Sequence, residues 1–237
     1  MGVGDTLRWA IRRSWDIVTD KDVRRSWFLA MSRPANLFQP YVDTCPDRYP
    51  EIFGFLQRQI EPGPNVRLLS FGCSQGDEVF SLRTYFPEAT IVGIDISRGN
   101  IRECRRRRRK SGDERIQFVR AGTASRQPEG FYDAVLCLAV LRHGDLGVNL
   151  SDSCADLITF EAFDQTVREL ALSVRVGGYL VIEHSNFRFC DSSCAARFQP
   201  VAAPALPSAG AITPLFGRDN VRLMDPEYRD VVFRKER

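Results

Sequence analysis

The fold of this chain is decided by residues 66–78, which read VRLLSFGCSQGDE. An apolar run, Val66–Phe71, leads into a loop with glycine at positions 72 and 76, and Asp77-Glu78 begins the next polar segment. A second apolar run, Thr90–Asp95, follows and ends on a carboxylate. Strand, glycine turn, helix, strand and acid in this order are typical of a doubly wound α/β domain with a ligand at the carboxyl ends of its strands.

Apolar runs and polar helical segments keep alternating along the chain. We expect strands at residues 66–71, 90–95, 116–120, 132–138 and 178–184, and helices at 51–60, 77–86, 97–110 and 159–174. The strands are apolar almost throughout, which is typical of a parallel sheet covered on both faces. Ser97 can cap the helix that follows it, and Gly177-Gly178 is expected to end the helix before the fifth strand.

The two ends of the chain have a different character. Residues 5–31 are expected to be helical, and residues 200–214, with four prolines, are expected to form a loop. The segments Val221–Met224 and Arg229–Arg234 look like two strands joined by a turn at 225–227, hence an antiparallel pair. The expected organisation is an N-terminal helical and loop extension, 1–63, followed by one globular unit, 64–237.

Composition excludes several classes of protein. The 237 residues are 43% hydrophobic and 27% charged, as in an ordinary globular protein, and contain no apolar run of about 18 residues that would span a membrane. Charged residues interrupt the N-terminus, so no signal peptide is expected. Seven cysteines at irregular spacings indicate reduced thiols in a cytoplasmic protein, and no metal site is expected.

The glycine loop narrows the choice of ligand. Dinucleotide sites prefer G-x-G-x-x-G, because a pyrophosphate sits on the helix N-terminus. Here position 74 is serine, and Asp77-Glu78 would repel a pyrophosphate. The pair suits a cationic or zwitterionic ligand instead, while Asp95 can accept hydrogen bonds from both hydroxyls of a ribose.

Four motifs in order resemble those of class I S-adenosylmethionine-dependent methyltransferases. Leu68–Glu78 resembles their first motif in the variant F-G-C-S-x-G-[DE]-E, and Ile91–Ser97 resembles the second. Tyr132–Leu141 is similar to the fourth-strand motif, and Val174–Ile182 is similar to the motif around the fifth strand. The resemblance implies an α/β, Rossmann-like, doubly wound and mostly parallel seven-stranded sheet with an antiparallel C-terminal strand pair.

The resemblance also assigns roles by position. The cofactor implied is S-adenosyl-L-methionine, with Asp95 on its ribose and Ile96 against its adenine. The residues implied to bind the cofactor are Gly72, Cys73, Ser74, Gly76, Asp95, Ile96, Thr123, Ala124 and Leu138. The third-strand end carries no acid for the adenine amino group, so the Thr123 hydroxyl or the backbone would serve there. Arg48, in the sequence Asp47-Arg48-Tyr49-Pro50, could pair with the cofactor carboxylate.

Two histidines are available for proton transfer. His143 and His184 follow the fourth strand and end the fifth strand, at the sheet edge where ligands bind. His143 is the candidate general base or acceptor-orienting group, beside the alternative of a loop histidine without a catalytic role. Phenylalanines at 187, 189, 198 and 216 suggest a partly apolar acceptor pocket, or packing beneath a loop.

The run Arg105–Lys110 is the strongest charge feature. Residues 98–120 hold ten Lys and Arg against three Asp and Glu, within a chain whose net charge is +3. Cations favour a helix C-terminus, and consecutive arginines point all round a helix, so a solvated helix end is expected. An anionic macromolecular partner and a localisation signal are the alternatives.

The sequence predicts a methyltransferase that acts on an oxygen or nitrogen atom of a small-molecule acceptor. The alternatives are a nucleic-acid or protein methyltransferase, and a non-catalytic relative that binds a nucleoside or a partner. Nucleic acid is a possible but less favoured partner, and the sequence leaves the oligomeric state open.

Overall fold

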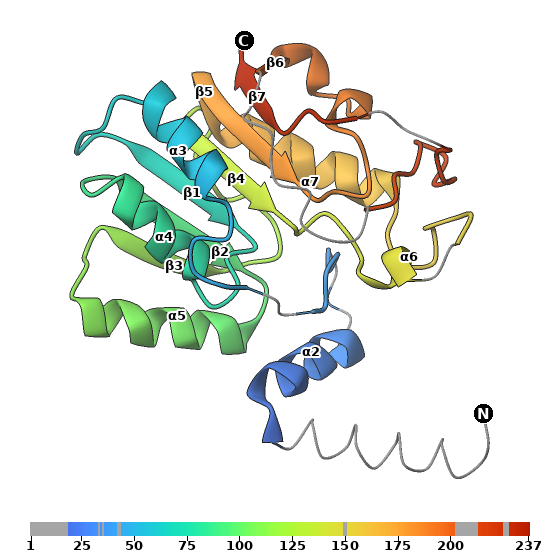
Figure 1. Ribbon diagram of the computed structural model, residues 1–237, viewed down its shortest axis with the longest axis horizontal. Coiled ribbons are helices and arrows are strands. Elements are labelled where there is room, and N and C mark those ends of the chain that lie inside the picture. The colour runs from blue at the N-terminus through green and yellow to red at the C-terminus, as the bar shows by residue number, and fades with distance from the viewer. Residues whose placement is uncertain are drawn as a thin grey trace.

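The centre of the molecule is a seven-stranded sheet with the strand order β3-β2-β1-β4-β5-β7-β6 (Figure 1). The computed structural model describes residues 19–32, 34, 36–41, 44–148, 151–201, 213–224 and 228–237. The strands are β1 Arg67–Phe71, β2 Thr90–Asp95, β3 Ile116–Arg120, β4 Tyr132–Leu138, β5 Val174–Glu183, β6 Phe198–Val201 and β7 Val232–Lys235. Strands β1 to β5 are mutually parallel, and β7 runs antiparallel to both of its neighbours.

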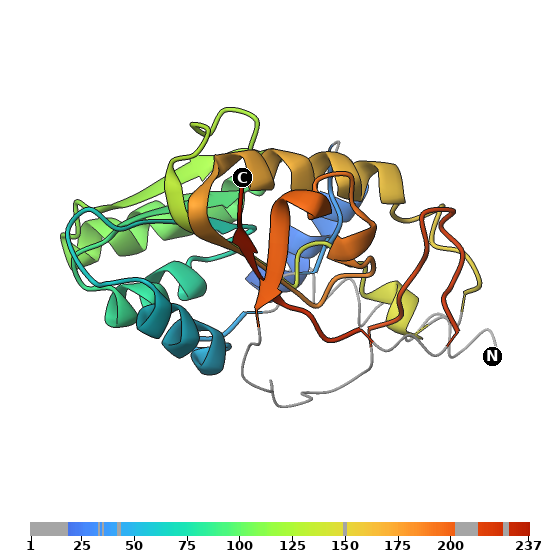
Figure 2. The same cartoon turned by 90° about the horizontal axis from the view of Figure 1, so that it is seen from above.

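Helices cover both faces of this sheet, as Figures 1 and 2 show. They are α2 Lys21–Ser32, α3 Pro50–Gln59, α4 Asp77–Tyr85, α5 Arg98–Ser111, α6 Asp145–Val148 and α7 Phe160–Ser173, with the 3-10 turns η1 Phe189–Asp191 and η2 Ala195–Arg197. Neighbouring residues of a strand point to opposite faces. Leu68 therefore packs with residues of α3 and α4, whereas Leu69 packs with residues of α7.

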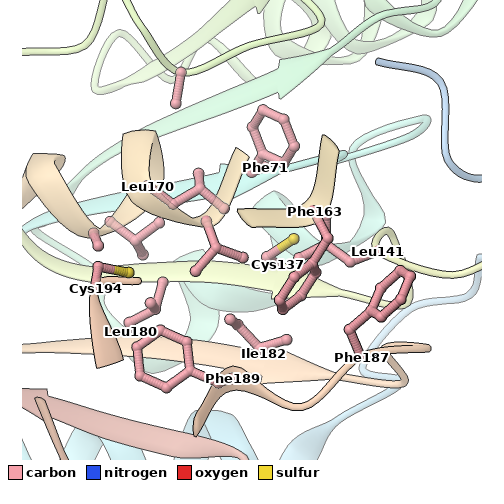
Figure 3. Packing of buried hydrophobic residues seen from close by; sticks show 14 of the residues in the cluster. Phe71, Cys137, Leu141, Phe163, Leu170, Leu180, Ile182, Phe187, Phe189 and Cys194 are labelled. Atoms are coloured by element: carbon pink, nitrogen blue, oxygen red, sulfur yellow. The ribbon is translucent and has the colours of Figure 1, made fainter. Parts of the chain in front are cut away.

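The two resulting cores confirm the prediction of a sheet buried on both faces. On the α7 side, Phe163 and Leu170 of the helix lie over Cys137, Leu180 and Ile182 of β4 and β5 (Figure 3). The other side is formed by α3, α4 and α5, whose apolar residues cover the opposite face of β1 and β2. The two rows of side chains fix the register of each strand, because a slip by one residue would exchange the faces.

The expected elements from residue 50 to residue 183 are confirmed to within a few residues, with one correction. Gly177-Gly178 does not end the helix before the fifth strand, because α7 already ends at Ser173 and both glycines lie inside β5. The β4–β5 register shifts here, between Tyr132 and Ala134. Gly177 has φ +76°, and a Cβ on Gly178 would lie 2.8 Å from the Asp133 carbonyl oxygen, so the pair forms a bulge that only glycine fits.

The antiparallel pair is confirmed, but the prediction of its members was wrong. The partner of β7 is β6, with Phe198 opposite Lys235 and Val201 opposite Val232, and not the segment 221–224. Val221 and Arg222 instead form isolated bridges to Ser153 and Phe216. Pro200 is accordingly a strand residue at the sheet edge and not part of the expected loop, which proline permits because the edge needs no further N–H donor.

Several expectations fall on residues outside the described part of the chain. These are the helix over residues 5–18, most of the loop at 200–214 and the turn at 225–227. Residues 21–31 of the expected N-terminal helix do lie in α2. Among the described residues, no helix combines the length and apolar character needed to cross a membrane.

Candidate functional site

The glycine loop after β1 is held tightly against the end of β2. The amide of Gly72 donates a hydrogen bond to the Ile94 carbonyl oxygen at 2.8 Å. Gly72 has φ +75°, and a Cβ there would lie 2.3 Å from Cγ2 of Val140, so no other residue fits. Ser74 and Ala139 also have positive φ, at 48° and 57°. Backbone strain of this kind clusters at functional sites, and these residues surround one cavity.

Asp95 joins the loop to helix α5. One carboxylate oxygen accepts a hydrogen bond from the Ser74 amide at 2.9 Å. The other accepts from the Ser97 amide at 2.7 Å and from the Asn100 side-chain amide at 3.2 Å. Asp95 is only 8% exposed, and this burial raises its pKa to about 6, against the three hydrogen bonds that favour the carboxylate. The residue is therefore ionised at neutral pH and still lines the cavity.

The cavity itself lies at the carboxyl ends of β1, β2, β3 and β4. The N-terminal segment contributes Leu29, Asn36, Leu37, Phe38, Gln39, Tyr41, Thr44, Cys45, Arg48, Tyr49 and Phe53. The sheet edge contributes Phe71, Gly72, Cys73, Ser74, Glu78, Asp95, Ile96, Asn100, Ala121, Gly122, Leu138, Ala139 and Val140. The segment before the sheet domain therefore forms one wall of the cavity, opposite the strand ends.

Four polar atoms that line this cavity are buried without a hydrogen-bond partner in the protein. They are Oη of Tyr49, Oγ of Ser74, Oε1 of Glu78 and Oδ1 of Asn100. A buried polar atom left unpaired costs about 1–3 kcal/mol. Four such atoms around one cavity are best explained by a polar ligand that pairs with them.

The two acids at the start of α4 have separate roles. Asp77 forms an ion pair of 2.6 Å with Arg107, and it does not line the cavity. Glu78 does line it, and burial raises the pKa of its carboxyl to about 7, with Ser70 and Arg48 acting in the opposite direction. A cation beside Glu78 would keep this carboxylate ionised. Of the predicted acidic pair, only Glu78 therefore faces the ligand cavity.

The residues expected to bind the cofactor are only partly brought together. Six of the nine line the cavity: Gly72, Cys73, Ser74, Asp95, Ile96 and Leu138. Gly76, Thr123 and Ala124 do not. Gly76 is the N-cap of α4, the Thr123 hydroxyl bonds that of Ser125, and Ala124 donates its amide to Glu169. Ala121 and Gly122 occupy the place expected of Thr123 and Ala124.

Neither histidine lines the cavity. The ring of His143 lies 6.2 Å from that of Tyr41, which does line the cavity and whose hydroxyl donates to Asp145. Burial lowers the pKa of His143, so its imidazole is neutral at pH 7. The ring of His184 lies 6.2 Å from that of Tyr49, and burial, Arg142 and Arg48 together lower its pKa.

The four phenylalanines suggested for the acceptor pocket are placed elsewhere by the structure. Phe187, Phe189, Phe198 and Phe216 are all buried in the core on the α7 side and do not line the cavity. Figure 3 shows Phe187 and Phe189 within this core. Phe187 packs on Phe216, and Phe189 on Phe198. Of the two possibilities for these rings, packing beneath the loops is therefore the correct one.

Sequence reasoning missed Asn100. It expected the N-terminal segment to build an acceptor pocket together with residues 142–158 and 185–216, but no described residue of those two ranges lines this cavity. The Asn100 side chain is 2% exposed inside the first turn of α5, where an asparagine contributes little to helix stability. An asparagine at this position of the helix was therefore a signal in the sequence for a role in the site. The segment 36–41 has no regular structure, so no periodicity marked it as a wall of the cavity.

Comparison with known proteins agrees with this geometry. Residues 69–178 match the family model of a methyltransferase domain. The U6 snRNA methylphosphate capping enzyme Amus of Drosophila melanogaster is 27% identical over 139 residues, which are 52% of this chain and 42% of that protein. This chain therefore matches less than half the length of that relative.

Similar solved structures include two methyltransferases. Geranyl diphosphate C-methyltransferase from Streptomyces coelicolor A3(2), solved with S-adenosyl-L-homocysteine, has a TM-score of 0.41 and 18% identity, covering 55% of this chain and 44% of that one. Phosphoethanolamine N-methyltransferase 2 of Haemonchus contortus, solved with S-adenosyl-L-methionine, has a TM-score of 0.43 and 17% identity, covering 60% and 29%. At these values neither carries a conclusion about activity.

The fold and the domain match define a class I methyltransferase domain on a Rossmann-like sheet. Residues 69–178 are thus similar to a methyltransferase domain, and S-adenosylmethionine is the cofactor of that domain family. The residues present fit this cofactor. The cavity offers unpaired buried polar atoms that would suit a ribose and a zwitterion, and the apolar side chains of Ile96 and Ala121 would suit an adenine.

Proposed function

We propose that this protein transfers a methyl group from S-adenosylmethionine to an oxygen or nitrogen atom of a small-molecule acceptor. The observation that carries the proposal is the set of four unpaired, buried polar atoms around one cavity at the carboxyl edge of the sheet. Ligands of open α/β sheets bind at this edge. The wall formed by residues 36–41 and 44–49 favours a small acceptor, because it restricts access to the strand ends.

The ribose would be shared between Asp95 and Asn100. A carboxylate offers about four acceptor positions, and three of those on Asp95 are already used by Ser74, Ser97 and Asn100. About one position is left for a ribose hydroxyl. The second hydroxyl would donate to Oδ1 of Asn100, which is buried without a partner. The amide of the same side chain donates to Asp95 and so orients that oxygen.

The methionine end would lie between Glu78 and Arg48. Both residues line the cavity, and each is close enough to affect the other electrostatically. Glu78 would bind the ammonium group and Arg48 the carboxylate, as opposite charges in a partly buried site do. Adenine would pack on Ile96 beside Ala121 and Gly122.

The protein contributes alignment and exclusion of water. The bound cofactor supplies an electrophilic methyl group on its sulfonium. Residues 36–41, residues 44–49 and the strand ends would hold an acceptor in line with that methyl group. Burial raises the pKa of Tyr49 to about 12, so its hydroxyl stays protonated and can orient an acceptor as a donor.

Proton removal is assigned to His143. Its imidazole is neutral at pH 7 and can accept a proton, but it does not line the cavity, and its ring lies 6.2 Å from that of Tyr41, which does. His143 would therefore act on an acceptor only when Tyr41 moves or relays the proton. We also propose a cytoplasmic protein, since all seven cysteines are free thiols, as suits a reducing compartment.

Calorimetric titration with S-adenosylmethionine tests the cofactor assignment. We expect saturable binding with a micromolar dissociation constant, and absence of heat at millimolar cofactor would contradict the assignment. A second experiment identifies the acceptor class. The protein is incubated with methyl-labelled cofactor and a cell extract, and label is measured in the small-molecule, nucleic-acid and protein fractions.

A nucleic-acid acceptor is the second candidate. It is favoured by the similarity to the Drosophila capping enzyme, whose name refers to U6 snRNA. Label in the nucleic-acid fraction would support it and contradict the small-molecule proposal. Cofactor binding without label in any fraction would indicate the non-catalytic alternative.

A further inference from the structure

Helix α5 and the end of the edge strand β3 carry five exposed arginines on one surface. They are Arg98, Arg102, Arg105 and Arg109 of α5 with Arg120 of β3, and together they line one shallow depression. We call them the arginine stripe. The helix and the strand lie side by side at the sheet's edge in Figure 1. We propose that the arginine stripe binds the phosphodiester backbone of a nucleic acid.

The stripe follows from helical geometry. The four helical positions are separated by four, three and four residues, which at about 100° per residue places them within roughly 60° of the helix circumference. The expectation that the consecutive arginines point all round the helix holds for Arg106, Arg107 and Arg108. That expectation considered only the consecutive run, whereas two of the stripe residues, Arg98 and Arg102, precede the run.

The arginines outside the stripe have partners in the protein. Arg106 pairs with Glu103, Arg107 pairs with Asp77 at 2.6 Å, and Arg108 donates to the Ile116 carbonyl oxygen at 3.3 Å. These contacts attach the helix to its neighbours. The two ion pairs explain the presence of Arg106 and Arg107 without any external ligand.

The arginine stripe has no such explanation. Within the described part of the chain, no ion pair joins a stripe arginine to a carboxylate, and Arg105 and Arg120 donate only to the carbonyl oxygens of Phe118 and Ile96. Favourable interaction with the helix dipole accounts for cations in the last turn only. Arg98 is the first residue of α5, where a cation is unfavourable and where the first turn has no acid.

The chemistry of the surface favours a nucleic-acid backbone over other anions. The four helical positions extend over about 17 Å, a length over which one strand of a B-form duplex carries about five phosphates. The stripe contains no aromatic residue for stacking a base and no apolar residue for entering a membrane. Binding should therefore depend on phosphates and be nearly independent of base sequence.

The stripe is next to the proposed adenine end of the cavity. Arg120 donates to the carbonyl oxygen of Ile96, and Arg98 follows the Ser97 that caps α5. None of the five stripe arginines lines the cavity proposed for the cofactor and the acceptor. The stripe would therefore hold the protein on a nucleic acid whether or not that nucleic acid is methylated, and the inference does not rest on the proposed acceptor.

The test compares two triple variants of the full chain. The first is Arg98→Gln/Arg102→Gln/Arg109→Gln, which leaves Arg105 and Arg120 and their carbonyl contacts in place. The matched control is Arg58→Gln/Arg126→Gln/Arg229→Gln, which removes the same charge from exposed positions elsewhere. Circular dichroism and cofactor binding confirm that both variants are folded.

Fluorescence anisotropy then measures binding to labelled 20-mer RNA and DNA duplexes over a range of salt. We expect the stripe variant to bind roughly 10- to 100-fold more weakly than wild type at about 0.1 M salt. The slope of log K against log salt should fall in magnitude by about three. The affinity of the control variant should change little. Preference for RNA or for DNA identifies the source of the phosphates. Equal loss in both variants, no binding to either duplex, or binding to phosphatidylserine vesicles alone would overturn the proposal.

Discussion

The two edges of the parallel sheet bury polar groups in opposite ways. At the amino edge, Asp133 is 9% exposed and accepts from the Arg67 amide at 2.8 Å and from Arg175 at 2.6 Å. Lys235, 8% exposed, donates to the carbonyl oxygens of Ala171 and Val174. These groups have partners within the protein and stabilise the fold.

At the carboxyl edge, buried polar side chains lack some of their hydrogen-bond partners. Tyr49, Ser74, Glu78 and Asn100 each bury an unpaired polar atom beside the cavity, and Asp95 shares this surface. A polar atom that is buried without a partner destabilises the free protein, and a ligand that forms a hydrogen bond with this atom offsets that cost. The amino edge therefore serves stability and the carboxyl edge serves binding, and four substitutions test this difference.

The largest effect is expected for Asp95→Asn. The new NH2 group replaces one carboxylate oxygen, so it faces either the Ser74 amide or the Ser97 amide, donor against donor. On the Ser74 side it also removes the acceptor for the ribose. We expect the dissociation constant of S-adenosylmethionine to rise about 100-fold, equivalent to about 2.7 kcal/mol, by calorimetry. Unchanged affinity in a folded variant would show that Asp95 does not bind the ribose.

Asp133→Asn is the matched change at the amino edge. It alters a carboxylate of similar burial and leaves Arg175 without its ion pair. We expect the free energy of unfolding in urea to fall by about 1–2 kcal/mol, reduced from the full value because Arg175 is half exposed. Cofactor affinity should stay within about twofold, and a large loss of affinity would erase the distinction between the edges.

Glu78→Gln is expected to act on stability with a defined pH dependence. Burial raises the pKa of Glu78 from 4.5 to about 7. Its contribution to the stability of the free protein is therefore fully present below about pH 4.5 and is lost as the pH rises through about 7. The glutamine variant should be more stable than wild type at pH 8, by on the order of 1–3 kcal/mol, and not at pH 4.5.

Urea unfolding of both proteins at the two pH values measures this difference. A variant that is less stable than wild type at pH 8 would mean that the Glu78 carboxylate is satisfied within the free protein. The same variant should bind the cofactor more weakly, because it lacks the charge that faces the ammonium group.

The smallest effect is expected for Lys235→Met. Methionine keeps the apolar stem of the lysine but leaves the Ala171 and Val174 carbonyl oxygens short of a donor. It also removes an ammonium group whose burial is unfavourable, as its lowered pKa shows. The two effects oppose each other, so the free energy of unfolding should change by at most about 1 kcal/mol in urea. A change in cofactor affinity would contradict its structural role.

The parallel part of the fold could be predicted from the sequence because its signals are local. Strands β1, β2 and β4 lie within predominantly apolar runs, and Ser97 marks the start of α5 as expected. The pairing of β6 with β7 joins segments about 30 residues apart, and the sequence of neither strand predicts which strand it pairs with. The bulge at Gly177-Gly178 was missed because a glycine pair after a helical pattern also fits a helix end.

The site was predictable where a strand end determines the position of a residue. Gly72, Asp95 and Leu138 follow or end strands, and all three line the cavity. The different roles of Asp77 and Glu78 depend on how far Arg107 reaches from another helix, and the role of Asn100 depends on how α5 packs on β2. Contacts between elements of this kind leave no pattern in the sequence.

A crystal structure with S-adenosylhomocysteine bound tests whether the cavity at the carboxyl edge is the cofactor site. We expect the ribose hydroxyls to bind Asp95 and Asn100, the ammonium group to bind Glu78 and the adenine to lie beside Ile96. The unpaired polar atoms of the carboxyl edge would then have hydrogen-bond partners. A ligand bound elsewhere, or in this cavity with Glu78 and Asn100 still unpaired, would contradict it.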